Sequence, residues 1–180
     1  MRRVRGVLAL ATVVAAAVAL PAVAAANVQP GTYQATFHPA NAPTGTHLAH
    51  RSAQPTCTVK QDLSVVCSSY TLAGVGNTNA RVRLVASYTA VVHCTNKGGK
   101  LVLAQTKTAT TSNTRAVTSS KNGKMVVPSI SVSPPTTALN VCPNPNWTAS
   151  IASLTLNSFR YTLRFAGFSG PYIVIRATDP

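Results

Sequence analysis

The clearest pattern in the chain is an alternation of apolar and polar positions between Arg81 and Cys94. Apolar side chains occupy every second residue there, which is the period of a strand with one buried face. The turn residues Asn96–Gly99 follow, and a second apolar segment begins at Leu101. We therefore expect one long strand joined by a hairpin to a return strand that starts at Leu101–Ala104.

Shorter strand-like segments recur along the chain, separated by clusters of Gly, Pro, Asn and Ser. Asn122–Gly123 predicts a type I′ hairpin turn between two of them. The apolar phase changes within 151–165, which predicts a bulge near Asn157–Ser158. Thr106–Ser120, rich in Thr and Ser, is expected to be a flexible edge rather than a firm strand. The remaining strands are expected at 32–37, 55–60, 64–67, 116–118, 125–127 and 172–175.

These patterns predict an all-β fold of about eight or nine strands, arranged as an antiparallel two-sheet sandwich that is immunoglobulin-like in the loose sense. No helical period is visible after residue 26, and residues 27–180 are expected to form a single domain. Three segments are expected to be loops, where function usually resides on such a scaffold. They are His38–Ala53, Ala73–Asn79 and Ser133–Asn146.

The first 26 residues have the organisation of a cleavable signal peptide. A basic start, Met1–Arg5, precedes the apolar run Gly6–Leu20, and the segment ends in Ala24–Ala26. An uncleaved membrane anchor is the alternative, but Pro21 and the small residues favour cleavage. We expect a secreted, extracellular product that begins at Asn27 and has no transmembrane segment.

The composition is strongly basic, with 16 Lys and Arg against 2 Asp and Glu. Removal of Arg2, Arg3 and Arg5 with the signal peptide would lower the net charge from +14 to +11. A field of one sign attracts polyanions in a salt-dependent way, and for an exported basic protein anionic polymers of the cell envelope are natural candidates. Specific recognition of nucleic acid is disfavoured, because the aromatic residues fall on apolar strand faces.

Four cysteines follow the signal segment: Cys57, Cys67, Cys94 and Cys142. An even number in an exported chain predicts two disulfide bonds, and the spacings lack the paired C-x2-C of a zinc site. A hairpin around 61–63 would set Cys57 opposite Cys67 and Val59 opposite Val65, with each cysteine on the same strand face as a valine. This register favours Cys57–Cys67 together with Cys94–Cys142.

Three segments are similar in style to stretches of small exported proteins: Val75–Ala80, Cys94–Gly99 and Cys142–Thr148. With its Ala-rich leader, the chain resembles uncharacterised exported all-β proteins of high-GC Gram-positive bacteria. That resemblance implies the fold class and no activity. The short spacing between Cys57 and Cys67 also resembles that of the neocarzinostatin-type apoproteins. This second likeness is an analogy of fold, because those carriers are acidic.

The shortage of carboxylates argues against most hydrolytic chemistry. The two acidic residues are Asp62, in an expected turn, and Asp179, beside the C-terminus. A glycosidase needs two carboxylates flanking one bond, and calcium sites need carboxylate clusters. The segment Gly167–Gly170 lacks the G-x-S-x-G spacing of a hydrolase elbow. We therefore expect no catalytic residues, no enzymatic activity and no cofactor.

Candidate binding residues are few. Possible anion-binding residues are Arg81, Arg83, Arg160 and Arg164, which would form a basic stripe if their strands share a sheet. The competing interpretation is that charges cover the solvent side of a strand and protect sheet edges. Trp147 could stack on a ligand, or pack beside a disulfide.

His38, His47 and His50 are weak metal candidates in a loop without a carboxylate to orient them, and His93 is expected to face outward.

The leading hypothesis is a secreted, non-enzymatic binding or structural module that associates with anionic envelope or extracellular polymers. The alternatives are a carrier of small ligands or an inhibitor that uses the loops, and, with less support, a metal-binding protein that uses the histidine loop. The patterns do not indicate an oligomeric state.

The signal peptide can be tested on the exported protein. Its intact mass should correspond to a chain that starts at Asn27, give or take about two residues, because the Ala24–Ala26 site directs cleavage there. Extracellular material that retains Met1 or the apolar run Gly6–Leu20 would contradict this.

Overall fold

The long strand expected from Arg81 to Cys94 is present in the computed structural model, which describes residues 27–136 and 141–178. It forms β7, Ala80–Thr95, in which every second residue from Ala80 to Cys94 is buried. β7 pairs antiparallel with β8, Leu101–Val117, on one side and with β11, Thr148–Phe165, on the other. The expected hairpin is confirmed, and its return strand β8 is longer than the sequence indicated.

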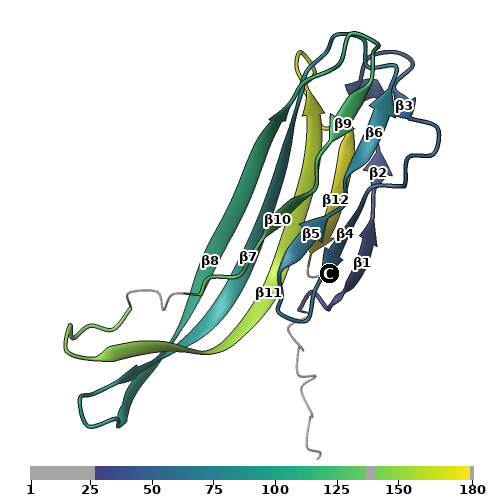
Figure 1. The fold of residues 1–180 in the computed structure, drawn as a ribbon. Coiled ribbons are helices and arrows are strands. Elements are labelled where there is room, and N and C mark those ends of the chain that lie inside the picture. Colours follow the sequence, from purple (N-terminus) through teal and green to yellow (C-terminus); the bar gives the residue numbers. More distant parts are fainter. Residues whose placement is uncertain (1–26, 137–140, 179–180) are drawn as a thin grey trace, which may run out of the picture.

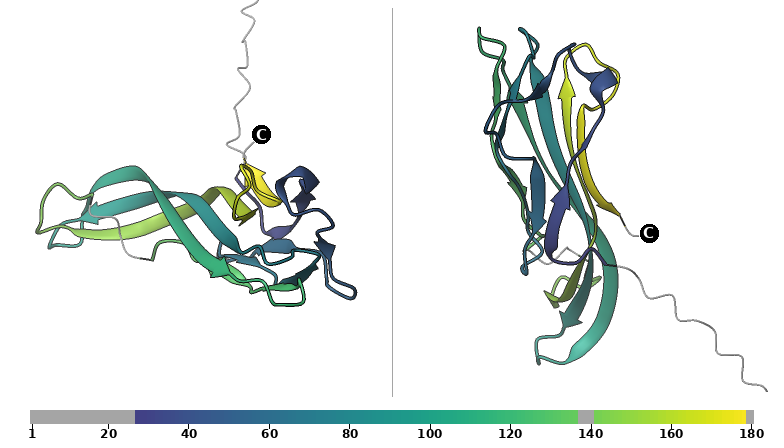
Figure 2. Two further views of the ribbon diagram at one scale, coloured as in Figure 1. Left: turned by 90° about the horizontal axis from the view of Figure 1, so that it is seen from above. Right: turned by 90° about the vertical axis from the view of Figure 1, so that its right-hand side faces the viewer.

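Around β7 the strands form a five-stranded sheet in the order β2-β12-β11-β7-β8. The added strands are β2, Thr36–Phe37, and β12, Ile173–Thr178. A second layer faces this sheet (Figure 2). It consists of a four-stranded sheet, β1-β4-β5-β10, and a three-stranded sheet, β3-β6-β9. Their bounds are Gly31–Gln34 (β1), His47–Leu48 (β3), Thr56–Val59 (β4), Val65–Cys67 (β5), Tyr70–Ala73 (β6), Met125–Val127 (β9) and Ile130–Val132 (β10).

The two smaller sheets form one interrupted layer. β5 leads into β6 after two residues, and β9 leads into β10 across Pro128 and Ser129. Proline has no N–H to donate to the ladder, so pairing stops there. β6 still pairs with β9, and β5 with β10, so the same two chain segments stay side by side through the break. The fold is all-β and antiparallel, as expected.

The hydrophobic core lies between the layers and contains alternate residues of β7 and β11 together with the inward residues of the second layer. A hydrogen bond of 2.8 Å joins the hydroxyl groups of Tyr70 in β6 and Tyr161 in β11 across this core. Burial is the main reason that the pKa of each phenol lies well above its ordinary value. The pair is therefore neutral, and each hydroxyl satisfies the other in a dry environment.

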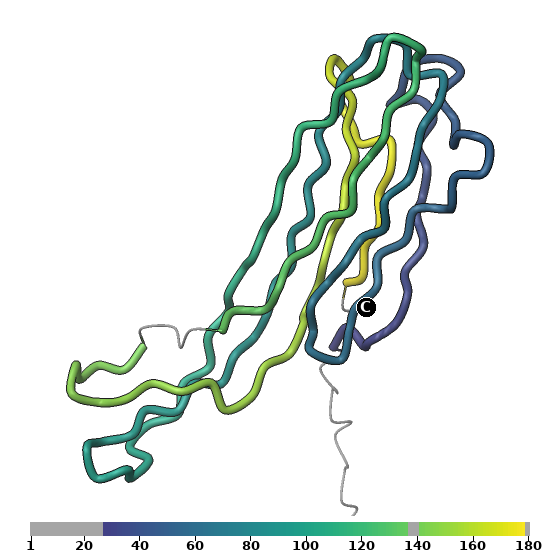
Figure 3. Tube along the Cα trace, viewed as in Figure 1, coloured from purple at the N-terminus to yellow at the C-terminus, as the bar shows by residue number. Residues whose placement is uncertain are grey.

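Three strands extend beyond the sandwich and form an arm, visible at the lower left of Figures 1 and 3. The arm contains the β7–β8 turn and the beginning of β11. Ala90, Val92 and Cys94 are fully buried there, although they lie outside the main core cluster.

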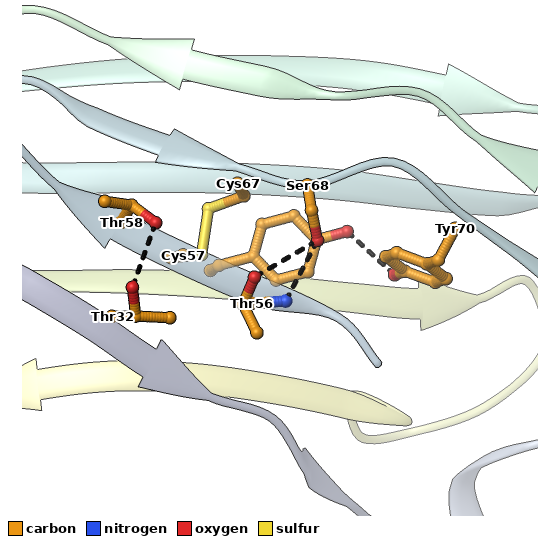
Figure 4. The surroundings of a disulfide bond; sticks show 8 residues. Thr32, Thr56, Cys57, Thr58, Cys67, Ser68 and Tyr70 are labelled. Carbon is orange, nitrogen blue, oxygen red and sulfur yellow. Dashed lines mark hydrogen bonds between the residues drawn. A yellow bond between two sulfur atoms is a disulfide. The ribbon is translucent and has the colours of Figure 1, made fainter. Parts of the chain in front are cut away.

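Both predicted disulfides are present. Cys57 lies opposite Cys67, and Val59 lies opposite Val65, in the expected register. Figure 4 shows Ser68 beside this bond, where its hydroxyl oxygen accepts a hydrogen bond of 3.0 Å from the Thr56 N–H. Cys94 is bonded to Cys142, which ties the segment before β11 to the arm.

The expectation of eight or nine strands is wrong in number, since residues 27–136 and 141–178 form 12. One reason is that the segment expected as a single strand from Thr32 to Phe37 divides at Ala35. β1 joins the second layer, whereas β2 joins the five-stranded sheet. Another is that the loop His38–Ala53 contains β3 and a short 3-10 helix, Pro39–Asn41.

The predicted hairpin at Asn122–Gly123 is also wrong. A turn does form, with Gly123 at φ +65° and its N–H bonded to the Ser120 carbonyl at 3.0 Å. Asn122 does not have the positive φ that a type I′ turn requires. The flanking strands β8 and β9 do not pair, because they enter different layers of the sandwich.

The segment Thr106–Ser120 is an edge, as expected, but most of it belongs to the continuous strand β8. β8 pairs with β7 along the whole length of β7. These hydrogen bonds keep the Thr-rich segment in a regular strand, which its sequence alone did not indicate. A register shift between Leu156 and Ser158 confirms the predicted bulge, and a second shift occurs between Ile151 and Ser153.

The expected signal peptide lies outside the described residues, as do Asp179 and part of the loop Ser133–Asn146. No helix in the described parts of the chain is long and apolar enough to cross a membrane.

The buried tyrosine pair predicts a loss of stability in alkali. Unfolded tyrosines ionise near pH 10, whereas the pKa of Tyr70 and of Tyr161 is raised in the folded protein. Their contribution to stability is therefore complete below about pH 10 and decreases as the pH rises above it. Replacing both residues with Phe should remove much of this alkaline slope and cost about 1 kcal/mol or less at pH 7.

Denaturant unfolding of these variants between neutral and alkaline pH provides the measurement. Tyr161→Phe alone should cost about 1–3 kcal/mol at pH 7, because it leaves the buried Tyr70 hydroxyl without its partner. Tyr33→Phe is the control, since the Tyr33 hydroxyl donates to the Gln29 carbonyl at an exposed position. An alkaline slope that is the same in the double variant and the wild type would refute the assignment.

The disulfides should differ in their effect on stability. Cys94–Cys142 links residues 48 apart and Cys57–Cys67 links residues 10 apart. In the chain-entropy model their removal costs about 4 and about 3 kcal/mol respectively. Guanidinium unfolding of the paired Cys→Ala variants tests this order. A larger loss in the Cys57→Ala and Cys67→Ala variant would mean that packing around these core residues outweighs chain entropy.

Candidate anion-binding face

The strand register places five arginines on the solvent side of the five-stranded sheet. Arg164 of β11 lies directly opposite Arg81 of β7, and Arg160 of β11 lies directly opposite Arg176 of β12. Arg83 is two residues from Arg81 and therefore points to the same side. All five are exposed. We call this set the arginine face: Arg81, Arg83, Arg160, Arg164 and Arg176.

Four of these residues were candidates from the sequence, and the structure brings them together. Arg176 was missed, because nothing in the sequence shows that β12 pairs with β11 in the register that sets Arg176 against Arg160. The available signal was the step from the buried run Ile173–Ile175 to exposed Arg176, and it does not identify the neighbouring strand.

The position of the strands excludes edge protection as the role of the four predicted arginines. The sheet ends at β2 and β8, whereas β7 and β11 are interior strands with partners on both sides. Charges that prevent edge-to-edge association belong on the outermost strands. The other part of that interpretation, that charges cover the solvent side of a half-buried strand, agrees with the exposure of these arginines.

The arginine face is not neutralised by carboxylates of the described residues. Asp62 is the acidic residue among them, and it lies in the β4–β5 turn of the other layer. Its carboxylate accepts hydrogen bonds from the Ser64 hydroxyl and N–H at 2.6 and 3.0 Å, which lower the pKa of Asp62. Like charges directly opposite each other destabilise a sheet. The pairs Arg81–Arg164 and Arg160–Arg176 therefore weaken this part of the sheet, and a bound anion would offset that cost.

Farther along β7, toward the arm, the same face of the sheet is covered by uncharged hydroxyl groups. β8 presents Thr or Ser at successive outward positions, opposite Ser87 and Thr89 among others. β11 adds further outward hydroxyls, including Thr155 opposite Thr89. We call these residues the hydroxyl strip: Ser87, Thr89, Thr106, Thr108, Thr110, Ser153, Thr155 and Ser158. Threonine favours strands, so these residues suit the sheet and at the same time cover this face with hydroxyl groups.

A hollow of about 810 Å³ lies at the upper end of the arginine face. Its lining includes Arg81, Arg83 and Arg164. The Nε–H of Arg164 donates a hydrogen bond of 2.9 Å to the Phe168 carbonyl, which positions that guanidinium at the rim. Phe168 belongs to the turn after β11, where Gly167 has φ +83°, a backbone conformation that favours glycine.

His38, His47 and His50 were weak metal candidates from the sequence. No group of three metal-ligating side chains occurs among the described residues. The Nδ1 of His47 lies 2.7 Å from the Gly45 carbonyl oxygen. The loop around His38, His47 and His50 is held to the sandwich by hydrogen bonds from Asn41 Nδ2 to the Pro171 carbonyl and from the Tyr172 hydroxyl to the Thr46 carbonyl.

His93 faces outward on β7, as expected, between buried Val92 and Cys94.

Trp147 lies far from the arginine face. Its side chain is half-buried in the turn before β11, and its backbone N–H donates a hydrogen bond of 3.0 Å to the Asn144 carbonyl. Arg164 is at the other end of β11, on the order of 50 Å away along the strand. Trp147 and the arginines therefore do not form a single binding site.

Comparisons with known proteins do not assign a family or a function to this chain. No protein-family model, no curated protein and no solved structure matches the chain.

Proposed function

We propose that this protein is a secreted, non-enzymatic binding module that associates with anionic polymers of the cell envelope or extracellular space through the arginine face. The observation that carries the proposal is the pairing of Arg81 with Arg164 and of Arg160 with Arg176 on interior strands. An anionic polymer would remove the repulsion that this arrangement creates.

The chemistry of the face suits a polymer better than a single small anion. Guanidinium groups present paired N–H donors that match phosphate or carboxylate oxygens. The arginines are spread over three adjacent strands, so one extended chain can contact several of them. Each contact releases a counterion, which makes the affinity depend on salt.

Sequence-specific recognition of nucleic acid is not supported. The outward positions of β7, β8 and β11 carry no Phe, Tyr or Trp on which bases could stack. Contacts from Arg, Thr and Ser to the phosphate backbone would position a nucleic acid without reading its base sequence.

Export accords with two further features. The first 26 residues have the pattern of a signal peptide, and the four cysteines are paired in two disulfides, as is usual in oxidising compartments. A non-enzymatic role accords with the two acidic residues of the whole chain, which leave little acid–base chemistry available.

Binding to envelope material should depend on the arginine face and on salt. The mature protein should sediment with envelope fragments in dilute buffer and be released as the salt approaches roughly 0.5 M, because charges at the surface are then screened. Replacing Arg81, Arg83, Arg160 and Arg164 with Gln should abolish sedimentation. The slope of log affinity against log salt should become shallower by about one for each arginine that no longer binds the polymer.

The matched control removes the same number of charges elsewhere. It replaces Lys97 and Lys100, in the β7–β8 turn, and Lys121 and Lys124, between β8 and β9, with Gln. If both quadruple variants lose binding equally, net charge alone explains the association and the arginine face is not the site. Retention that is insensitive to salt would favour a neutral ligand and a loop-based carrier instead.

A further inference from the structure

The hollow at the upper end of the arginine face is lined by several side chains that can donate hydrogen bonds. Three guanidinium groups and three hydroxyl groups line it, and none of its lining residues is acidic. The donor residues are Arg81, Arg83, Arg164, Ser112, Thr114 and Thr162.

The register explains why these donors converge. Thr162 of β11 and Thr114 of β8 lie on either side of Arg83 in β7, so the three form one row across the sheet. Arg81 and Arg164 form the next row. Two rows of outward side chains on adjacent strands are separated by only about 7 Å along the strand, so one small group can meet donors from both.

The rim of the hollow is held in place. The Asn79 carbonyl accepts a hydrogen bond of 2.8 Å from the Ala166 N–H, and its side-chain oxygen accepts one of 3.2 Å from the Ser119 N–H. Arg164 is positioned by its bond to the Phe168 carbonyl. That bond uses one of its five N–H donors, so the remaining four are available to a ligand.

From this donor set we infer that the hollow binds a phosphate ester group carried by a polyhydroxylated polymer. A phosphate ester offers three acceptor oxygens and up to two negative charges, whereas a carboxylate offers two oxygens and one charge. Several guanidinium groups combined with hydroxyl donors match the phosphate better.

The hydroxyl strip indicates the character of the rest of the polymer. It continues from the hollow along the same face of β7, β8 and β11 and carries Thr and Ser without an aromatic platform. Such a surface can exchange hydrogen bonds with sugar or polyol hydroxyls. This inference rests on the proposed function and adds the chemical group that the site prefers.

The experiment compares three soluble polymers that share one neutral backbone: phosphorylated dextran, carboxymethyl dextran and dextran sulfate, each at the same degree of substitution. Affinities are measured by calorimetry with the mature protein at one salt concentration. The phosphorylated polymer should bind about tenfold more tightly than the other two. Unmodified dextran should give no measurable binding, because the charged groups supply most of the attraction.

A pair of uncharged substitutions separates the hollow from general attraction. Thr114→Val with Thr162→Val removes two hydroxyls of the hollow and leaves every charge in place. It should lower the affinity for phosphorylated dextran about tenfold, with the salt slope unchanged and the affinity for carboxymethyl dextran changed less than twofold. Thr32→Val with Thr58→Val, a cross-strand pair of threonines in the other layer, is the matched control.

A charge-matched pair of single variants gives a second measurement. Arg83→Gln lies in the hollow, whereas Arg176→Gln lies on the arginine face outside it. Arg83→Gln should reduce binding of the phosphorylated polymer several-fold more than Arg176→Gln. Thermal unfolding of each variant verifies that the fold is retained.

The possible failures are distinct. Equal affinities for the three charged polymers, with no effect of the hollow variants, would overturn the phosphate site and leave the proposed function standing. A preference for dextran sulfate or carboxymethyl dextran would overturn the choice of phosphate. An absence of binding to every charged polymer at low salt would overturn the proposed function and this inference with it.

Discussion

The register of β7 with β8 and β11 is the constraint on which the rest of the structure depends. β7 is hydrogen-bonded on both sides along its length, and alternate residues face the core. A shift of one residue would send Val82 and Leu84 to solvent and Arg81 and Arg83 into the core. The alternation that builds the core therefore also fixes the arginines outward, so the fold and the candidate site share one physical cause.

The second layer consists of shorter strands that pack against the five-stranded sheet. The chain passes between the layers at Ala35 and again between β8 and β9, and both passages are short. Tyr70 and Tyr161 add a polar contact across the otherwise apolar interior. A buried hydroxyl pair is stable only when its partners meet, so it favours one relative placement of the two layers.

The arginine face conflicts with the stability of the sheet that carries it. Solvent-facing charges on strands are common, but like charges placed opposite each other on neighbouring strands repel. The chain has 16 basic and 2 acidic residues, and among the described residues no carboxylate lies on this face. Under the proposed function, an anionic polymer from outside the protein offsets the repulsion.

Features that depend on local periodicity and on covalent chemistry could be predicted from the residues alone. The alternation from Arg81 to Cys94, the bulge after Leu156 and the pairing of Cys57 with Cys67 all follow from residue spacing, because a strand has a fixed period of two. The identity of neighbouring strands emerged with the folded arrangement. Ala35 and the turn at Gly123 send adjacent segments into different layers, and the placing of β12 beside β11 brings Arg176 to the arginine face. Strand order depends on how all the apolar faces are buried together, and no single segment contains that information.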